Sequence, residues 1–320
     1  MAGRVLVTGG AGFVGSHVVD ALLTAGYSPF VLDNLSTGRR ENLPPDVPLY
    51  VADIRDGAEV DRVVAEVRPR YVFHLAAQIS VSRSVREPDY DADVNILGFL
   101  RVLEACVRHG VERVVFASSG GTLYGEVTHP ATEDSPLRPI SPYGLSKLAG
   151  EQYLAFYART HGLKAISLRY ANVYGPRQDP HGEAGVVAIF TRRLLAGQPP
   201  IINGDGRYVR DYVYVEDVAR AHLQALAVDL PEPFAAFNVG TGVGTDVNRL
   251  EQLLREAVLT VAGDALPAPP PPPQYGPPRP GDLRSSILSP DRARQVLGFE
   301  PQVSLPEGLR RTVRWFAEHR

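Results

Sequence analysis

Short apolar runs alternate, in the first half of the chain, with segments in which apolar residues recur every three or four positions. The runs predict strands at 5–7, 30–33, 49–52, 71–75, 114–118 and 165–170, and the segments between them predict amphipathic helices. This alternation is typical of an α/β fold, a Rossmann-like doubly wound parallel sheet with helices on both faces. Ligands of such sheets bind beyond the carboxyl ends of the strands, so we expect the functional residues there.

The regular alternation ends near Tyr170, after which Pro and Gly become frequent. We therefore expect a second, smaller region in the C-terminal half. A proline run at 269–273 favours polyproline II structure and is either an extended connector or a ligand for an SH3-type domain. Its position inside the chain favours the connector.

Three glycines, Gly9, Gly12 and Gly15, follow the first apolar run and open a segment with helical spacing. They allow a sharp turn, a close approach of the backbone to a pyrophosphate and a helix N-terminus aimed at it. Asp33 ends the next apolar run, at the offset where a carboxylate accepts hydrogen bonds from an adenosine ribose. Because a carboxylate repels a 2′-phosphate, NAD is favoured over NADP. The alternatives are an ordinary tight turn for the glycines and a simple turn of Asp33 with Asn34.

Composition excludes several classes of partner. The chain has 320 residues, of which 44% are hydrophobic and 22% charged, and a net charge of −3. Lys and Arg are dispersed, so neither nucleic acid nor an anionic membrane is an expected partner. No apolar run approaches the roughly 18 residues of a membrane span and no leader pattern is present, so we expect a cytoplasmic protein. The only cysteine, Cys106, lies in an apolar helical pattern and is expected to be a buried structural residue; no metal site is expected.

Tyr143 and Lys147 stand four residues apart, which on a helix places both on one face. A free tyrosine has a pKa of about 10, so a base near neutral pH needs that pKa lowered by roughly 3 units. The cation of Lys147 and a positively charged nicotinamide both favour the phenolate. Such a pair is usually structural when it stands alone. Here it follows a dinucleotide-binding unit and the strand end at Ser118 and Ser119, so we interpret it as catalytic.

A series of ordered motifs resembles the extended short-chain dehydrogenase/reductase family, and within it the nucleotide-sugar 4-epimerases of the UDP-glucose 4-epimerase type. The resemblance covers nearly the whole chain. Its landmarks are Thr8-Gly9-x-x-Gly12-x-x-Gly15, Asp33 to Gly38, Asp53-Ile54, His74 to Gln78, Asn95, Tyr124-Gly125, Tyr143-x-x-x-Lys147, Arg169 to Pro176, Val209 to Val213 and Arg279-Pro280-Gly281-Asp282.

The resemblance implies an NAD cofactor, a UDP-sugar substrate and a division of the chain. Residues 1–171, rejoined by about 207–238, are expected to form the NAD-binding domain, and 172–206 and 239–320 the sugar-nucleotide-binding region. The implied cofactor-binding residues are Gly9, Gly12, Phe13, Val14, Gly15, Asp33, Asn34, Ser36, Thr37, Gly38, Asp53, Ile54, Leu75, Ala76, Ala77, Gln78, Asn95, Ser118, Tyr143, Lys147 and Tyr170. The implied substrate-binding residues are Thr122, Asn172, Arg210, Arg279, Asp282 and Ser286.

Within this set, the resemblance assigns Asn172, Arg210 and Arg279 to the diphosphate and Asp282 to the uridine ribose. Guanidinium groups suit that task because they offer paired donors and stay protonated. Arg210 has a structural alternative, which is an ion pair with a neighbouring Asp211 or with Asp217.

The implied reaction has no net redox change. Tyr143 removes the proton from the sugar 4-hydroxyl while hydride passes from C4 to NAD, and the 4-keto sugar turns over before hydride returns to its other face. Because NAD is regenerated in each turnover, we expect it to stay bound and the enzyme to work without added cofactor.

One position departs from the family pattern. The family usually has Ser or Thr four residues before the Tyr of the Tyr-Gly pair, as the hydroxyl that shares the substrate proton with the base, whereas this chain has Gly120. Either Ser119 or Thr122 takes over that role, or the hydroxyl is dispensable.

Other positions separate this chain from related enzymes. Nucleotide-sugar 4,6-dehydratases have adjacent Asp and Glu where this chain has Gly121 and Thr122, so dehydration lacks its proton donor. UDP-glucuronate decarboxylases usually have Glu at the place of Thr122. Ser286 stands where a bulky Tyr restricts the resembling epimerases to plain hexoses, so its small side chain predicts that UDP-GlcNAc and UDP-GalNAc also react.

Three other functions are compatible with the fold: 4-epimerisation of another nucleotide sugar such as UDP-glucuronate, an NAD-dependent reductase, and a non-catalytic dinucleotide sensor. The presence of both Tyr143 and Lys147 argues against the sensor. The resemblance also implies a homodimer, formed through helices near 99–109 and 143–161.

Overall fold

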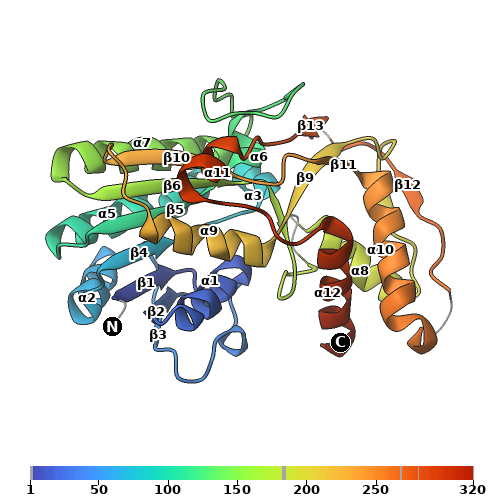
Figure 1. Ribbon diagram of the computed structural model, residues 1–320, viewed down its shortest axis with the longest axis horizontal. Coiled ribbons are helices and arrows are strands. Elements are labelled where there is room, and N and C mark those ends of the chain that lie inside the picture. Colours follow the sequence, from blue (N-terminus) through green and yellow to red (C-terminus); the bar gives the residue numbers. More distant parts are fainter. Residues whose placement is uncertain (1–2, 182–184, 267–268, 280, 320) are drawn as a thin grey trace.

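A seven-stranded parallel sheet forms the centre of the larger part of the molecule (Figure 1). The computed structural model describes residues 3–181, 185–266, 269–279 and 281–319. The strand order is β10-β6-β5-β4-β1-β2-β3. The strands are β1 (Arg4–Thr8), β2 (Ser28–Asp33), β3 (Leu49–Val51), β4 (Tyr71–His74), β5 (Arg113–Ser119), β6 (Lys164–Tyr170) and β10 (Phe234–Val239). The predicted doubly wound fold is confirmed; β10 is a strand that the apolar pattern does not indicate.

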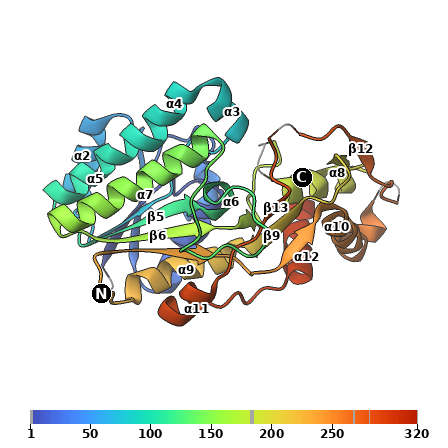
Figure 2. The same cartoon turned by 90° about the horizontal axis from the view of Figure 1, so that it is seen from above.

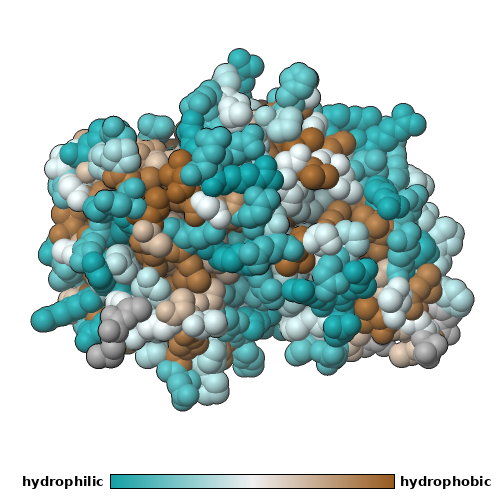
Figure 3. All heavy atoms as spheres, viewed as in Figure 1, coloured by the Kyte–Doolittle hydropathy of each residue, from teal (hydrophilic) through white to brown (hydrophobic). Residues whose placement is uncertain are grey.

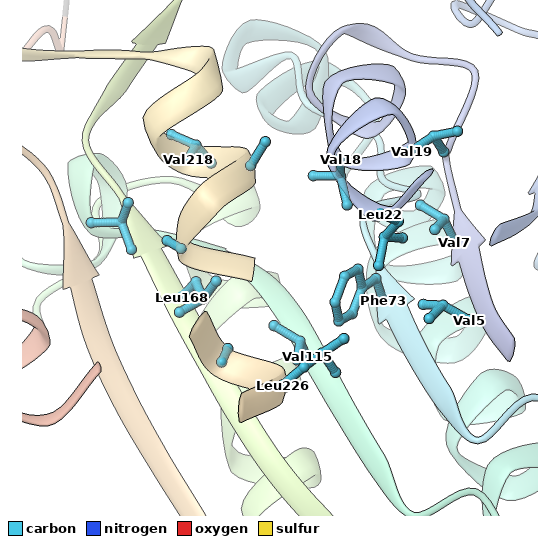
Figure 4. Close-up of a cluster of buried hydrophobic side chains, with 14 of the residues drawn as sticks. Val5, Val7, Val18, Val19, Leu22, Phe73, Val115, Leu168, Val218 and Leu226 are labelled. Carbon is cyan, nitrogen blue, oxygen red and sulfur yellow. The ribbon is translucent and has the colours of Figure 1, made fainter. Parts of the chain in front are cut away.

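Helices cover both faces of the sheet because alternate strand residues are apolar on both sides. On β1, Val5 and Val7 join one core and Leu6 the other. The first face carries α1 (Phe13–Thr24), α9 (Val215–Ala227) and α11 (Asp291–Leu297), and Figure 4 shows side chains of α1 and α9 gathered around Phe73. The second face carries α2 (Gly57–Val67), α5 (Phe99–Arg108) and α7 (Pro142–His161). Cys106 is fully buried in this second core, as expected.

A smaller region lies beside the carboxyl edge of the sheet and has its own apolar core (Figures 1 and 2). Its helices are α8 (Val186–Leu195), α10 (Val247–Ala262) and α12 (Leu305–Glu318). Its short strands are β7 (Asn172–Tyr174), β8 (Ile201–Asn203), β9 (Val209–Tyr214), β11 (Gly244–Asp246), β12 (Gln274–Gly276) and β13 (Ser285–Ser286). The proline run 269–273 leads directly into β12, which agrees with the connector interpretation. Helix α11 packs on the sheet, although it falls within the range 239–320 assigned to this region.

Short elements at the carboxyl ends of the strands bring side chains toward the edge where the two regions meet. After β4 come α3 (Val81–Arg86), α4 (Pro88–Ala92) and a π-helical turn (Asp93–Gly98), and after β5 comes α6 (Gly120–Leu123). Two 3₁₀ turns complete the described elements: Arg40–Asn42 lies between β2 and β3, and Gly263–Ala265 follows α10. Figure 3 shows a mixed surface on the face of Figure 1, with polar side chains interspersed among apolar ones. Among the described residues, no helix is long and apolar enough to cross a membrane.

Candidate active site

The loop between β1 and α1 has the shape of a diphosphate cradle. Gly9 has a φ of 70°, and a Cβ there would lie 2.6 Å from the backbone nitrogen of Ala76, so the loop can pass this close to the segment after β4 only with glycine. A Cβ on Gly15 would collide with the carbonyl oxygen of Gly9. Helix α1 begins at Phe13 with no side-chain N-cap and no acidic residue in its first turn. Its positive dipole end and first N–H groups therefore suit an anion.

Two carboxylates stand at the ends of the neighbouring strands. Asp33 at the end of β2 accepts backbone N–H groups of Ala11 at 3.0 Å and Leu35 at 2.8 Å, and burial raises its pKa. The bond to Leu35 is a local turn contact. Asp33 also lines the cleft described below, so it both forms a turn and contributes to the cleft wall. Asp53, after β3, pairs with Arg55 at 2.9 Å, and the hydrogen bonds from that guanidinium lower its pKa to about 2. Asp53 is thus firmly ionised.

A cleft of about 930 Å³ opens above these strand ends. Most predicted cofactor-binding residues line it: Gly9, Gly12, Phe13, Val14, Gly15, Asp33, Asn34, Ser36, Thr37, Asp53, Ile54, Leu75, Ala76, Ala77, Gln78, Ser118, Tyr143, Lys147 and Tyr170. Gly38 instead packs against the Asp33 carboxylate, where a Cβ would lie 2.9 Å from its oxygens. Asn95 lies one layer behind, hydrogen-bonded to Gln78.

The cleft fits a dinucleotide on grounds independent of the motif. Ser118 Oγ lines it and is a buried hydroxyl with no hydrogen-bond partner among the described residues. Such an atom costs free energy unless a ligand satisfies it. Together with the uncapped N-terminus of α1, it leaves polar groups for a bound cofactor.

Part of the cleft wall comes from residues that the motifs do not indicate. They belong to the loop after β7, to α8 and to the end of α12: Arg177, Gln178, His181, Arg192, Trp315 and His319. The loop is held to α1 by the ion pair of Arg177 with Asp20, 2.8 Å long. These residues are far from the glycine loop in sequence, and no local pattern marks them.

Tyr143 and Lys147 occupy the first turns of α7, whose N-cap Ser141 accepts the N–H of Gly144 at 3.1 Å. Lys147 is buried, and its Nζ lies 5.7 Å from the Tyr143 ring centre and donates to the carbonyl of Ala117 at 2.9 Å. Burial lowers the pKa of Lys147 to about 8 and raises the pKa of Tyr143 well above its usual value. In the protein alone Tyr143 is therefore protonated near neutral pH, and Lys147 does not by itself produce the expected phenolate.

The structure distinguishes the two hydroxyls that the sequence leaves as alternatives. Ser119 is hydrogen-bonded to the phenol oxygen of Tyr143, which lowers the pKa of Tyr143 against the effect of burial. Thr122 Oγ1 instead donates to the carbonyl of Ser119 at 3.4 Å. A Cβ on Gly120 would lie 2.5 Å from the side chain of buried Leu288, so the usual Ser at that position would require Leu288 to move.

Three side chains from separate strands converge above Gly121. The position of a Cβ on Gly121 lies 3.8 Å from Asn172 Oδ1, 3.9 Å from Ser286 Oγ and 4.0 Å from Ser119 Oγ. Asn172 comes from β7 and Ser286 from β13, and both strands pair with β9. The missing side chain at 121 leaves a small space bordered by an amide and two hydroxyls, next to Tyr143.

Arg210 on β9 approaches the same region, paired with Asp282 at 2.5 Å. The structural alternative for Arg210 is wrong, because its predicted partners are already engaged. Asp211 accepts the hydroxyl of Thr241 at 2.6 Å along with backbone N–H groups, and Asp217 pairs with Arg220.

The remaining predicted residue, Arg279, is exposed on the segment after β12. Among the described residues, no group of three or more His, Cys, Asp or Glu side chains is placed to hold a metal ion.

Comparison with known proteins agrees with this geometry. Residues 5–240 match the NAD dependent epimerase/dehydratase family. The chain is 48% identical over 322 residues to the UDP-glucose 4-epimerase of Mycolicibacterium smegmatis, covering 98% of both.

Two solved structures are also similar. One is the UDP-glucose 4-epimerase of Thermotoga maritima with UDP-glucose, at 52% identity, 99% of both chains and a TM-score of 0.93. The other is the UDP-glucose 4-epimerase of Thermus thermophilus in complex with NAD, at 52% identity, 98% of this chain, 99% of the other and a TM-score of 0.88. The fold, the cleft and these similarities together show that the chain belongs to the NAD-dependent epimerase/dehydratase family.

Proposed function

We propose that this protein is an NAD-dependent UDP-glucose 4-epimerase, an isomerase that interconverts UDP-galactose and UDP-glucose. One observation carries the proposal: Ser119, hydrogen-bonded to Tyr143, borders the same small space as Asn172 and Ser286. Tyr143, the partner of Ser119, lines the dinucleotide cleft. The named activity of the similar proteins, and their complexes with UDP-glucose and with NAD, support it.

Tyr143 is the proposed base for the sugar 4-hydroxyl, with Ser119 passing the proton to it. NAD bound in the cleft supplies the hydride acceptor, and its positive nicotinamide favours the phenolate that the protein alone does not. Lys147 holds its ammonium beneath the ring of Tyr143 and is also the proposed donor to the cofactor ribose. Once the 4-keto sugar has turned, Tyr143 returns the proton as hydride returns to the other face.

The proposed diphosphate ligands are Asn172, Arg210 and Arg279, with Asp282 at the uridine ribose. Two cations offset the charge of a diphosphate, and each guanidinium can donate two parallel hydrogen bonds. The ion pair of Arg210 with Asp282 supports this assignment, because it brings two of these residues together. Thr122, also proposed to bind the substrate, lies in the same short helix as Gly121.

The sugar space also bears on the range of substrates. Ser286 is buried, with its small hydroxyl side chain near Gly121 in place of a bulky ring. We therefore include UDP-GlcNAc and UDP-GalNAc among the proposed substrates. Dehydration remains unfavourable, since positions 121 and 122 carry no carboxylic acid.

The first test is to incubate the purified protein with UDP-galactose, without added NAD, and to follow UDP-glucose by NMR. We expect conversion to equilibrium, because the cofactor is regenerated and stays bound. A Tyr143→Phe variant is the control and should be inactive. UDP-GalNAc tests the space at Ser286, and UDP-glucuronate tests the alternative epimerase. No conversion of any of the three would overturn the proposal, and a strict need for added NAD would overturn cofactor retention alone.

We further propose that a second copy of the chain covers the outer face of α5 and α7, which lie side by side (Figure 2). Leu145, Tyr153 and Phe156 recur on one face of α7 and are 41–55% exposed, and Leu97, just before α5, is 47% exposed. Four large apolar side chains on adjoining elements are typical of a helix–helix interface.

The cytoplasmic location stays a prediction.

A further inference from the structure

A buried polar network lies behind the cofactor cleft, centred on Asp91 at the end of α4. Asp91 is 1% exposed, and its Oδ1 accepts Gln78 Nε2 at 2.8 Å and Asn95 Nδ2 at 3.0 Å. Asn95 also exchanges two hydrogen bonds with the backbone of Gln78, each 2.9 Å long. A carboxyl group held this deeply costs free energy unless hydrogen-bond donors compensate for its lost hydration.

The network continues to the helix that carries Tyr143. Asn95 Nδ2 contacts Ser146 Oγ at 3.3 Å, and Ser146 Oγ donates to the carbonyl of Tyr143 at 2.9 Å. From α3, Ser84 Oγ accepts the N–H of Tyr143 at 3.1 Å. The backbone of Tyr143 is therefore fixed on both sides by hydroxyls, and the same chain of contacts reaches the wall of the cleft at Gln78.

Asp91 also acts on the catalytic pair through its charge. Its carboxylate raises the pKa of Tyr143, in the same direction as the larger effect of burial. It also raises the pKa of Lys147, in the opposite direction to the larger effect of burial. The other ionisable groups that interact with the pair are Glu151 on α7, which also raises the pKa of Lys147, His74 on β4, and Tyr170 on β6. Burial lowers the pKa of His74 well below its usual value, so it stays neutral.

We propose that Asp91 is a positioning residue for the reaction: its buried carboxylate, fixed by Gln78 and Asn95 and linked through Ser146 to the backbone of Tyr143, holds a negative charge behind the pair of Tyr143 and Lys147. The proposal rests on the proposed roles of Tyr143 and Lys147. It assigns a function to the helix–π-turn segment 88–98, which brings Asp91 and Asn95 together beneath the pair. No substrate contact by Asp91 is involved.

The test is the pH dependence of kcat for UDP-galactose in the wild type and in Asp91→Asn. The amide keeps an oxygen acceptor for Gln78 and Asn95 but removes the negative charge, so the network can persist. Without that charge, Tyr143 loses its proton at lower pH and Lys147 loses its charge at lower pH. We expect both limbs of the bell-shaped profile to move to lower pH by about one unit.

Asp89→Asn is the matched control, the same change at an exposed position of the same helix, and it should leave the profile unmoved. Asp91→Glu, which restores the charge, should bring the limbs back toward their wild-type positions. A lower kcat in Asp91→Asn with both limbs in place would show a purely structural role and overturn the proposal.

A readout without turnover covers the case in which Asp91→Asn is inactive. The Tyr143 phenolate is titrated by ultraviolet difference absorbance against the same chain with Tyr143→Phe. A shift of this titration to lower pH in Asp91→Asn would support the proposal. An unshifted titration would overturn it. A wild type without epimerase activity would instead contradict the proposed function.

Discussion

At the scale of single residues, our proposal for the proton-relay hydroxyl depends on one contact between distant parts of the chain. Leu288 occupies the place that a side chain at Gly120 would need, and the hydroxyl that we propose as the proton relay stands one residue earlier, at Ser119. The sequence shows that the usual hydroxyl is absent, but not which neighbour replaces it, because the answer depends on which side chain reaches the phenol of Tyr143.

Ser119→Ala is expected to lower kcat for UDP-galactose by about 10²–10⁴-fold, the usual contribution of a proton-transfer group. The fold should remain, since only a hydroxyl is replaced by hydrogen at a partly exposed position. Thr122→Ala is the control and should change kcat far less, because its hydroxyl faces the carbonyl of Ser119. Steady-state kinetics of the two variants decide between the hydroxyls; an equal loss in both, or in neither, would contradict the assignment.

At the scale of secondary-structure elements, the position of α7 on the sheet matters because this helix carries both Tyr143 and Lys147. Glu151, one turn further along, pairs with Arg169 of β6 at 2.7 Å, and both side chains are buried. Arg169 also donates to the hydroxyl of Tyr124 at 2.8 Å. The pair joins the catalytic helix to the sheet, and it lies behind the site, not in it.

Glu151→Gln leaves the buried guanidinium of Arg169 without its counter-charge. We expect the free energy of unfolding to fall by about 3–5 kcal/mol, the usual cost of removing one partner of a buried pair. Glu59→Gln, in the exposed pair with Arg62, is the control and should cost about 0–1 kcal/mol. Urea unfolding of both variants measures the difference, and an equally small loss in both would refute this account of α7.

At the scale of the whole molecule, the arrangement of two regions leaves two surfaces with different roles. The carboxyl edge of the sheet faces the smaller region (Figure 1). Residues of both line the cleft. The outer face of α5 and α7 lies away from the cleft and exposes apolar side chains. The first surface is where the ligands are proposed to bind, and the second is where a second copy is proposed to pack.

Phe156→Glu places a charge in the proposed interface, where it would be desolvated without a partner. We expect light scattering to show a fall from the mass of a dimer to that of a monomer at micromolar concentration. Leu259→Glu, at a similarly exposed position of α10, is the control and should keep the wild-type mass. A wild type that is already monomeric would remove the basis for this interface.

The sequence by itself determines the doubly wound sheet, the glycine cradle with Asp33, and the pairing of Tyr143 with Lys147 on one helical face, because each depends on local periodicity or short spacing. Tertiary structure alone decides what depends on long-range approach. It places Leu288 over Gly120, gathers Asn172, Ser286 and Ser119 around Gly121, and adds β10 and α11 to the sheet. It also decides the burial of Tyr143, which no local pattern reveals and which raises the pKa of its phenol in the protein alone.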